Sequence, residues 1–351
     1  MLAHAESPES LSPIELDTYL THGWFRMGQT IFTTQFLCFQ NRLYNAVWLR
    51  IDLNEWENDL KQKDIYKRNS LFRVEIIKAT YSAQHEKLFS DYKQGVAFEG
   101  SSSLHQLLFG ENLRNIYNTY EVNVFDGESL IACGIFDIGN ESAEGISCFY
   151  NHTYKKYSLG KYLIYLKMEY CKNIGLHYFY PGYFVPGYKA FDYKLDIAKS
   201  ALYYWNIKIG SWQRLQELNL NQLPLETMKN KLTLLQEALL AVGIKSTLLR
   251  YEFFDANLVP HLRGSMLFDY PVFLYAFNLK EDTIYPLLIF NVLQDSYQWL
   301  EVRSVWVSNF PYASDEVYSS HVLKVNKIIF AFKKQAEVVD YFLKSAAALN
   351  Y

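Results

Sequence analysis

The sequence predicts an α+β protein built around a mixed sheet with flanking helices. In the middle of the chain, strand-like runs joined by turn residues are followed by one helix-periodic segment and a further strand. The composition is that of a folded chain, because 50% of the 351 residues are hydrophobic and 34 Lys and Arg nearly balance 37 Asp and Glu. This composition argues against disorder and excludes nucleic-acid binding through bulk charge alone.

The first region, residues 1–112, is expected to form an N-terminal part of its own. Apolar spacing predicts helices at 13–22 and 81–94, and residue type predicts a strand at 44–53. Between the strand and the second helix lies a stretch rich in Lys and Arg. Such a stretch either meets phosphates or forms an ordinary solvated face.

The middle region, residues 113–220, has the clearest pattern. Strand-like runs at 120–125 and 129–136 flank Asp126-Gly127-Glu128, and an Asp-Gly pair between such runs predicts a hairpin because Gly tolerates a positive φ. A third strand is predicted at 145–150. These three strands are therefore expected to be antiparallel.

One helix and one strand follow the three strands. Ser158 is a candidate N-cap for a helix whose apolar positions recur with helical spacing and which ends at Gly175. A strand is predicted at 176–180, ending at Pro181-Gly182. Because the helix connects them, this strand must return parallel to the third one.

Three antiparallel strands, a helix and a parallel strand is the order found in acyltransferases of the GNAT superfamily. In such a sheet two central strands splay apart and expose backbone groups where an acyl donor can lie. The helix N-terminus offers unpaired N–H groups to phosphate. The analogy predicts acyl transfer without naming the acyl group.

The last region, residues 221–351, is predicted to be an α+β extension of unknown role. A helix follows Pro224 and stops at Gly243. Strand-like runs and a closing helix then follow, at 248–254, 272–278, 287–293, 299–307 and 334–349. This region contains no recognisable chemical motif.

The cysteines indicate neither a disulfide framework nor a zinc site. Cys38, Cys133, Cys148 and Cys171 are widely separated and form no C-x-x-C pair, which fits a reducing compartment. No run approaches the roughly 20 apolar residues that span a bilayer. We expect a soluble cytoplasmic protein with no membrane partner.

Several segments share the order and spacing of one known family. In the middle region they are Phe149-Tyr150-Asn151, Ser158-Leu159-Gly160-x-Tyr162, Gly175-Leu176-x-Tyr178-x-Tyr180-x-Gly182-Tyr183 and Tyr193-Lys194. They resemble the C-terminal half of arginyl- and leucyl-tRNA protein transferases, in which Phe-Tyr-Asp-Pro leads to Ser-Leu-Gly-x-Tyr, Gly-Leu-x-Tyr-x-Tyr-Leu-Gly-Tyr and Lys-Met-x-Tyr-Lys. Upstream, the weaker matches are Gly23-Trp24-Phe25-Arg26-Met27-Gly28, Lys67-Arg68-Asn69 and the helix from Tyr81 to Tyr92. The resemblance spans residues 16–197.

The chain departs from the family pattern in three places. Phe36 and Phe39 stand where family members carry cysteines of an N-terminal cluster, and Cys38 alone cannot ligate a metal or an iron–sulfur cluster. Asn151-His152 replaces Asp-Pro, and Ala190-Phe191 replaces Lys-Met. We therefore expect a divergent member without a metal or other cofactor.

The resemblance implies transfer of arginine or leucine from aminoacyl-tRNA to the N-terminal α-amine of a protein, a step of N-end-rule protein degradation. The partners would be the charged tRNA and proteins with an acidic or otherwise destabilising N-terminus. An aminoacyl ester is already activated, so the enzyme has to position amine and ester, accept one proton and stabilise the oxyanion. Neither a metal nor a nucleophilic triad is required.

The resemblance also supplies candidate residues. The catalytic candidates are Tyr150, Asn151, Tyr180 and Tyr183. The substrate-binding candidates are Ser158, Leu159, Gly160, Gly182, Tyr193, Lys194, Arg26, Lys67 and Arg68.

Each candidate has a purely structural alternative. Tyr178 and Tyr180 share one face of their strand by period-two alternation, so this pair is either site or core. Asn151 either binds substrate or caps a loop, and Lys194 either pairs with a phosphate or an acidic residue or forms a salt bridge. Ser158 either begins a phosphate-facing helix or is an ordinary helix start.

Two other functions compete with aminoacyl transfer. An acyl-CoA-dependent N-acyltransferase would carry Arg/Gln-x-x-Gly-x-Gly/Ala at the helix start, but alignment on Gly160 puts Tyr157 and Tyr162 at the outer positions, where the second would crowd the cofactor. A binding relative that kept the fold and lost the reaction is the other alternative.

Overall fold

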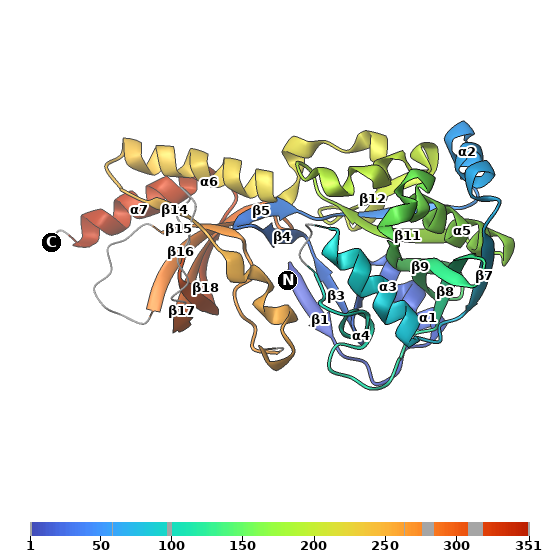
Figure 1. Cartoon of the computed structure of the whole chain (residues 1–351). Helices are drawn as coiled ribbons and strands as arrows, with labels where there is room; N and C mark the ends of the chain where they lie inside the picture. Colours follow the sequence, from blue (N-terminus) through green and yellow to red (C-terminus); the bar gives the residue numbers. More distant parts are fainter. Residues whose placement is uncertain are drawn as a thin grey trace. The chain divides into compact units, whose positions relative to one another are not determined.

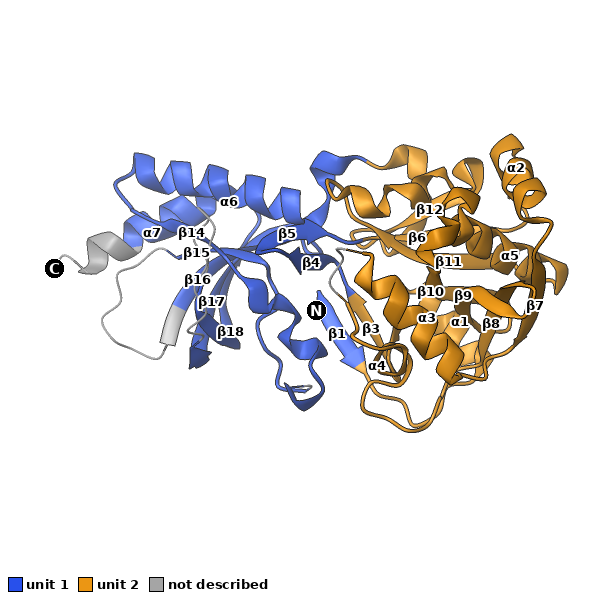
Figure 2. Ribbon diagram, viewed as in Figure 1, with its two compact units in different colours: residues 1–5, 34–46, 219–351 blue, residues 6–33, 47–218 orange. Residues whose placement is uncertain are grey.

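The computed structural model of the chain describes residues 2–57, 59–96, 100–262, 264–275, 284–307 and 319–349. It forms two compact units (Figure 2). One comprises residues 1–5, 34–46 and 219–351, and the other comprises residues 6–33 and 47–218. Both sides of the boundary expected at residue 112 therefore belong to the second unit, whereas the division after 218 lies close to the boundary expected at 220.

The second unit is built on an eight-stranded mixed sheet in the order β13-β12-β6-β11-β10-β9-β8-β7 (Figure 1). From one edge to the other, the strands are β13 (Ser211–Arg214), β12 (Leu202–Asn206), β6 (Val47–Asp52), β11 (Tyr178–Phe184), β10 (Ser142–Tyr150), β9 (Ser129–Ile138), β8 (Thr119–Asp126) and β7 (Arg73–Lys78). Strands β8, β9 and β10 are antiparallel, and β11 runs parallel to β10. The predicted order of strands is confirmed. Strands β6 and β7 lie in the first 112 residues, so that part of the chain contributes two strands to this sheet.

Helices cover both faces of this sheet. On one face lies α5 (Leu159–Asn173), whose Leu163 and Lys167 side chains reach over Gly134 of β9. On the other face, α3 (Ala83–Gln94) and α4 (Leu104–Phe109) pack in a hydrophobic cluster with Cys133 and Ile135. Since neighbouring residues of a strand point to opposite faces, α5 and α3 lie on opposite sides of the sheet.

The remaining elements of the second unit are short. They are α1 (Pro13–Thr21), α2 (Leu60–Asn69), the hairpin of β2 (Phe25–Met27) with β3 (Thr30–Thr34), and 3-10 helices including η1 (His152–Tyr157) and η2 (Lys189–Asp196). The helices predicted at 13–22 and 81–94 are confirmed as α1 and α3. Strand β11 continues through Pro181-Gly182 to Phe184, so the prediction that this strand ends at Pro181 is wrong.

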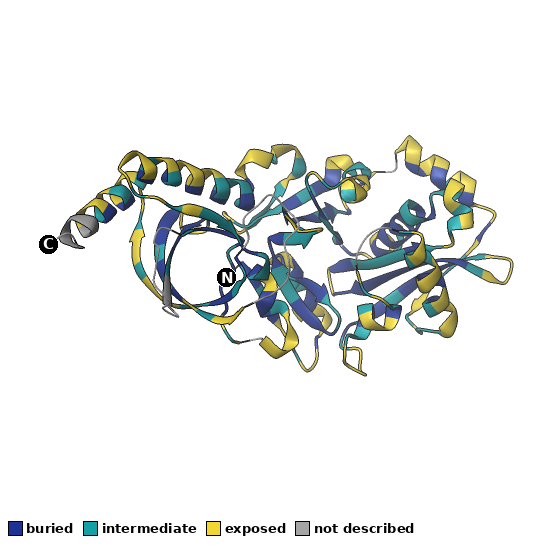
Figure 3. Cartoon of the chain, turned by 60° about the vertical axis from the view of Figure 1, so that its left-hand side comes forward, coloured by how far each residue is buried: buried dark blue, intermediate teal, exposed yellow. Residues whose placement is uncertain are grey.

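The first unit contains an antiparallel sheet in the order β14-β15-β16-β17-β18. Its elements are β1 (Ala3–Glu6), the β4 (Phe36–Phe39) and β5 (Arg42–Asn45) hairpin, α6 (Pro224–Ala241), β14 (Thr247–Arg250), η6 (Glu252–Leu258), β15 (Val272–Tyr275), β16 (Ile284–Asn291), β17 (Ser296–Val307), β18 (His321–Phe332) and α7 (Gln335–Leu349). The helix predicted after Pro224 is confirmed as α6, which alternates buried and exposed residues along its length (Figure 3). The strand predicted at 248–254 ends earlier, at Arg250, because residues 252–258 form η6. Of the strand predicted at 272–278, residues 276–278 lie outside the described residues.

Within the described ranges, no helix is both long enough and apolar enough to cross a membrane.

Candidate functional site

Strands β10 and β11, at the centre of the large sheet, diverge. Strands β10 and β11 pair only where Ser142, Ala143 and Glu144 lie opposite Tyr178, Phe179 and Tyr180. Beyond these pairs β10 stays with β9 as far as Tyr150, and β11 pairs with β6 from Gly182 onward. The result is a fork, which we define as the diverging segments 145–150 and 181–184.

Lys194, from η2, lies in the fork on the β11 side. Its Nζ donates a hydrogen bond of 2.7 Å to the carbonyl oxygen of Tyr183 and lies 5.4 Å from the centroids of both the Tyr183 and Phe191 rings. Burial, opposed by Cys148 and assisted by the Lys167 ammonium, lowers the pKa of Lys194 to about 7. Near neutral pH this side chain therefore exists both as an ammonium and as a free amine.

Gly182 makes room for that lysine. A Cβ atom at this position would lie 3.1 Å from Lys194 Nζ, and the backbone has φ of +83°, which L side chains rarely adopt. The conformation at Gly182 thus lets the chain turn beneath the lysine.

Tyr150 and Tyr193 lie on the β10 side of the fork. The Tyr150 ring covers Gly160 at the start of α5, where a Cβ atom would lie 3.4 Å from Tyr150 Cε1. Tyr193 is 39% exposed, but desolvation of its phenol raises its pKa, and the nearby Cys148, Tyr92 and Tyr150 raise it further. The fork therefore brings together six predicted residues, namely Tyr150, Gly160, Gly182, Tyr183, Tyr193 and Lys194.

The start of α5 differs in part from the prediction. Ser158 is the N-cap residue of α5, as predicted, but it adopts a left-handed conformation with φ of 57° and its side chain makes no capping hydrogen bond. Leu159 is fully buried and belongs to the core. The Ser158 hydroxyl thus leaves the first-turn N–H groups of α5 without a side-chain cap, beside the Tyr150 ring.

Asn151 has the structural role that we had considered as its alternative. Its Oδ1 accepts hydrogen bonds from the Thr153 backbone N–H at 3.0 Å and from the Thr153 hydroxyl at 2.8 Å. It therefore caps η1, which directly follows β10.

Tyr180 does not share the surroundings of Lys194. It is fully buried, its ring lies 5.4 Å from that of Trp212, and it packs in a cluster with Phe25 and Trp48. Burial raises its pKa to about 12, so the phenol stays protonated. Of the two catalytic candidates that lie on β11, Tyr180 and Tyr183, only Tyr183 contacts the lysine.

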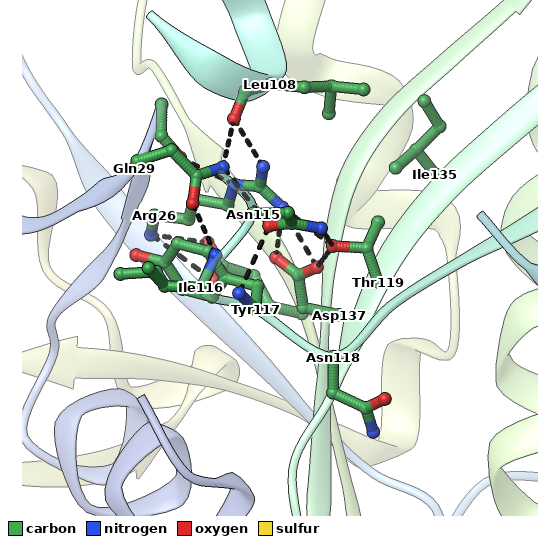
Figure 4. Close-up of polar contacts among 12 residues, drawn as sticks. Arg26, Gln29, Leu108, Asn115, Ile116, Tyr117, Asn118, Thr119, Ile135 and Asp137 are labelled. Atoms are coloured by element: carbon green, nitrogen blue, oxygen red, sulfur yellow. Dashed lines mark hydrogen bonds and ion pairs between the residues drawn. The ribbon is translucent and has the colours of Figure 1, made fainter. Parts of the chain in front are cut away.

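Arg26 is a buried structural residue (Figure 4). Its guanidinium pairs with the Asp137 carboxylate at 2.9 Å, donates to the Thr119 hydroxyl at 3.1 Å and lies 4.4 Å from the centroid of the Tyr117 ring. The exposed fractions of the Arg26 and Asp137 side chains are 1% and 0%. The expected contact of Arg26 with tRNA or with an acidic N-terminus does not fit this burial.

A second carboxyl group completes this cluster. Glu144 of β10 accepts hydrogen bonds from the Arg26 backbone N–H at 3.1 and 3.3 Å. Burial, and next the charge of Asp137, raise the pKa of Glu144 to about 8. The Glu144 carboxyl is therefore largely protonated at neutral pH.

Lys67 and Arg68 lie on the exposed surface of α2. Arg68 donates a hydrogen bond of 2.9 Å to the carbonyl oxygen of Lys156 in η1. Both cations are accessible, but they are not among the residues of the fork.

Lys167 was missed by the sequence analysis. It is 1% exposed, and its Nζ donates to the carbonyl oxygens of Ile135 at 3.0 Å and Ser147 at 2.8 Å. Ser147 follows the register shift in β10, so the lysine satisfies carbonyls where the sheet is irregular. Lys167 lies four residues after Leu163, on the apolar stripe of the helix, and this position could have predicted that it is buried.

The residues at the family's cysteine positions do not fit a metal or an iron–sulfur cluster. Phe36 is buried and packs on Phe254, with the two ring centroids 5.8 Å apart. The ring centroids of Phe39 and Tyr44 are 6.0 Å apart. Phenyl rings offer no ligand atom to a metal ion, and Cys38 supplies only one thiol. Among the described residues, no group of three His, Cys, Asp or Glu side chains is arranged to hold a metal ion.

One known protein family matches the part of the chain that contains the fork. Residues 84–204 match the family model of the arginine-tRNA-protein transferase C terminus. This segment of the chain is similar to an arginine-tRNA-protein transferase C-terminal domain. It runs from α3 to β12 and includes the fork and η2, whereas Arg26, Lys67 and Arg68 lie outside it.

Curated relatives of the arginine-tRNA-protein transferase domain are distant. An aspartate/glutamate leucyltransferase of Campylobacter jejuni is 24% identical over 183 residues, which cover 50% of this chain and 74% of the relative. The protein of the same description in Helicobacter hepaticus is 25% identical over 182 residues, covering 50% and 73%. Among solved structures, L-PGS from Bacillus licheniformis has a TM-score of 0.32 and 12% identity over 48% of this chain and 49% of the other, a level that supports no inference.

Proposed function

We propose that the second unit has a GNAT-like core and that the protein transfers arginine or leucine from charged tRNA to the N-terminal α-amine of a protein. The observation that carries the proposal is the fork between β10 and β11, with Lys194 and Tyr193 of η2 in it, inside the segment that matches the transferase family. The names of the relatives favour leucine as the transferred residue and aspartate or glutamate at the acceptor's N-terminus. Such a product fits N-end-rule degradation in the cytoplasm.

The reaction needs little more than positioning and one proton transfer. The α-amine nitrogen forms a bond with the aminoacyl carbonyl carbon, the ester C–O bond breaks, and the ribose hydroxyl leaves with a proton. The attacking amine must lose a proton, and its reference pKa of about 7.7–8.0 leaves a minority neutral at pH 7. A group with a pKa near 7 that accepts this proton would raise the reactive fraction.

In this proposal Lys194 accepts the proton. Its pKa of about 7 gives a free amine at neutral pH. The hydrogen bond to the Tyr183 carbonyl fixes the amine at the end of β11. This role replaces the expected ion pair with a phosphate or an acidic side chain, because burial disfavours a permanent charge on Lys194.

Other groups of the fork would hold the aminoacyl end of the tRNA. The first-turn N–H groups of α5, which Ser158 does not cap, suit a phosphate or the developing oxyanion. The aromatic rings of Tyr150 and Tyr193 offer a surface for the terminal base. The exposed cations Lys67 and Arg68 are suited to the phosphate backbone further along the tRNA.

The test is a transfer assay with purified protein. Labelled arginine or leucine is supplied on tRNA, with acceptor peptides that begin with Asp, Glu, Lys or Arg, and acetyl-CoA serves as the alternative donor. Transfer from charged tRNA that is lost in Lys194→Met and kept in Lys189→Met supports the proposal, since Lys189 is an exposed residue of the same η2. Label transferred only from acetyl-CoA indicates an ordinary acyltransferase, and tRNA binding without transfer indicates a binding protein.

A further inference from the structure

Arg50 lies at the level of the fork on the neighbouring strand β6. Strand β6 pairs with β11 through Ile51 opposite Phe179 and Leu49 opposite Gly182, with a register shift between the two pairs. Arg50 therefore stands beside the irregular Tyr180-Pro181 segment, where β10 and β11 begin to diverge.

Aromatic rings surround the Arg50 guanidinium. Its central carbon lies 4.3 Å from the ring centroid of Tyr178, 5.3 Å from that of Tyr203 and 5.1 Å from that of Trp212. All four side chains are half-buried. Rings at these distances make cation–π contacts, and a guanidinium stacked in this way keeps its in-plane N–H groups for a ligand.

The guanidinium has no anionic partner among the residues that the structure describes. Within the described ranges, no carboxylate oxygen lies within 4 Å of Arg50, and its buried Nε has no hydrogen-bond acceptor. The neighbouring Arg214 differs, because its guanidinium pairs with Glu55 at 2.9 Å. The Glu55 carboxylate also accepts a hydrogen bond from the Tyr203 hydroxyl at 3.1 Å.

A second donor without an acceptor lies next to Arg50. The Tyr180 hydroxyl is buried, and within the described part of the chain its hydrogen meets no acceptor. Burial raises the pKa of Tyr180 to about 12, against the lowering effects of the Arg50 charge and of hydrogen bonding from the Thr21 and Arg50 side chains to the phenol oxygen, so the phenol remains a donor. A buried donor without an acceptor costs free energy, and a ligand that supplies an acceptor would recover it.

We propose that Arg50 and Tyr180, enclosed by Tyr178, Tyr203 and Trp212, bind a single carboxylate, namely the acidic side chain at the N-terminus of an acceptor protein. A planar carboxylate matches the in-plane donors of a guanidinium. One unpaired cation suits one monoanion, whereas a nucleic-acid backbone needs several. Naming this acceptor class rests on the proposed function, while the carboxylate site rests on the local geometry alone.

The experiment measures peptide binding without tRNA. Isothermal titration calorimetry compares a hexapeptide that begins with Asp and the same peptide beginning with Asn, on the wild type, Arg50→Gln, Arg50→Lys and Arg214→Gln. The wild type is expected to bind the Asp peptide at least about tenfold more tightly, as for a hydrogen-bonded charge pair. The preference should disappear in Arg50→Gln, survive in part in Arg50→Lys and remain complete in Arg214→Gln. Near-ultraviolet circular dichroism and thermal melting establish that each variant is folded.

The outcomes separate this inference from the proposed function. An Asp preference that survives Arg50→Gln, or no preference in the wild type, overturns the inference. Displacement of the Asp peptide by inorganic phosphate at equal concentration overturns the assignment to a carboxylate. If the Asp peptide binds in a way that depends on Arg50 but nothing is transferred from charged tRNA, the carboxylate site is supported and the proposed function is contradicted. If transfer to the Asp peptide is unaffected by Arg50→Gln, the proposed function is supported and the carboxylate site is contradicted.

Discussion

Lys194 Nζ donates a 2.7 Å hydrogen bond to the carbonyl oxygen of Tyr183, and this contact joins η2 to the end of β11. The lysine is buried at a place where β11 no longer pairs with β10. A cation held in this way costs desolvation energy, which lowers its pKa toward neutrality. The fork therefore combines an opening in the sheet with a basic group that titrates in the physiological range.

The first prediction concerns the lysine itself. Lys194→Met should lower transfer by about 10²- to 10⁴-fold, the range that general acid–base catalysis supplies. Met keeps most of the volume of the side chain, so the free energy of unfolding should change far less than the rate. Steady-state kinetics and urea denaturation of the same preparations measure both quantities. Equal losses of activity and stability would show that Lys194 is only a core residue.

The second prediction is a pH profile. Transfer should rise with pH through about 7 as Lys194 loses its proton. Without the lysine, the remaining rate of Lys194→Met should follow the acceptor amine instead, with a midpoint near its pKa of about 7.7–8.0. Single-turnover rates from pH 5.5 to 9 distinguish the two profiles, and identical midpoints would count against the assigned role.

Lys194 also predicts a dependence of stability on pH. Its pKa is lowered from 10.5 to about 7 on folding, so between these values the unfolded chain binds more protons. The contribution of Lys194 to the free energy of unfolding therefore increases as the pH rises from about 7 toward 10.5, and it is lost on acidification. Denaturation at pH 7, 8 and 9 should show a steeper rise for the wild type than for Lys194→Met.

The contribution of Glu144 to the free energy of unfolding should change with pH in the opposite direction. Its pKa is raised from 4.5 to about 8, so the folded chain binds more protons between these values. The stability that this group contributes is present in full below about 4.5 and is lost as the pH rises through 8. Glu144→Gln keeps an acceptor for the Arg26 N–H and removes the titration, so its unfolding free energy should fall less than that of the wild type between pH 5 and 8. A wild-type slope retained in this variant would contradict the shift.

Arg26 and Asp137 should matter for folding rather than for tRNA. Arg26→Met leaves a buried carboxylate without its partner and should cost about 3–5 kcal/mol. The double variant Arg26→Met with Asp137→Leu should recover part of this loss, because no unpaired charge remains. Urea denaturation of the wild type, both single variants and the double variant measures the free energies of unfolding for this double-mutant cycle. A folded Arg26→Met protein with normal stability and weakened tRNA binding would contradict this prediction and support a role of Arg26 in binding.

Much of the fold and part of the site could be predicted from the sequence. The crossover rule requires β11 to run parallel to β10, and the family pattern pointed to Tyr150, Gly182, Tyr183 and Lys194. Period-two alternation placed Tyr178 and Tyr180 on one face of the strand, but it cannot tell which face Lys194 contacts. The face of a strand that belongs to a site depends on contacts between segments that are distant in the sequence.

Non-local partners explain the other differences. Arg26 and Asp137 are 111 positions apart, so a sequence pattern shows a cation but not its buried partner. Asn151 caps a helix of 3-10 type that the analysis did not predict. Lys167 was accessible to sequence reasoning, because a charged residue on the apolar stripe of a helix must find buried acceptors.

The most direct test is one comparison of labelled transfer. Wild-type protein, Lys194→Met and Lys189→Met are each incubated with leucyl- or arginyl-tRNA and a peptide beginning with Asp. The account predicts a labelled peptide with wild type and Lys189→Met and at least about a 10²-fold lower rate with Lys194→Met. Undiminished transfer by Lys194→Met, or label arriving only from acetyl-CoA, would contradict it.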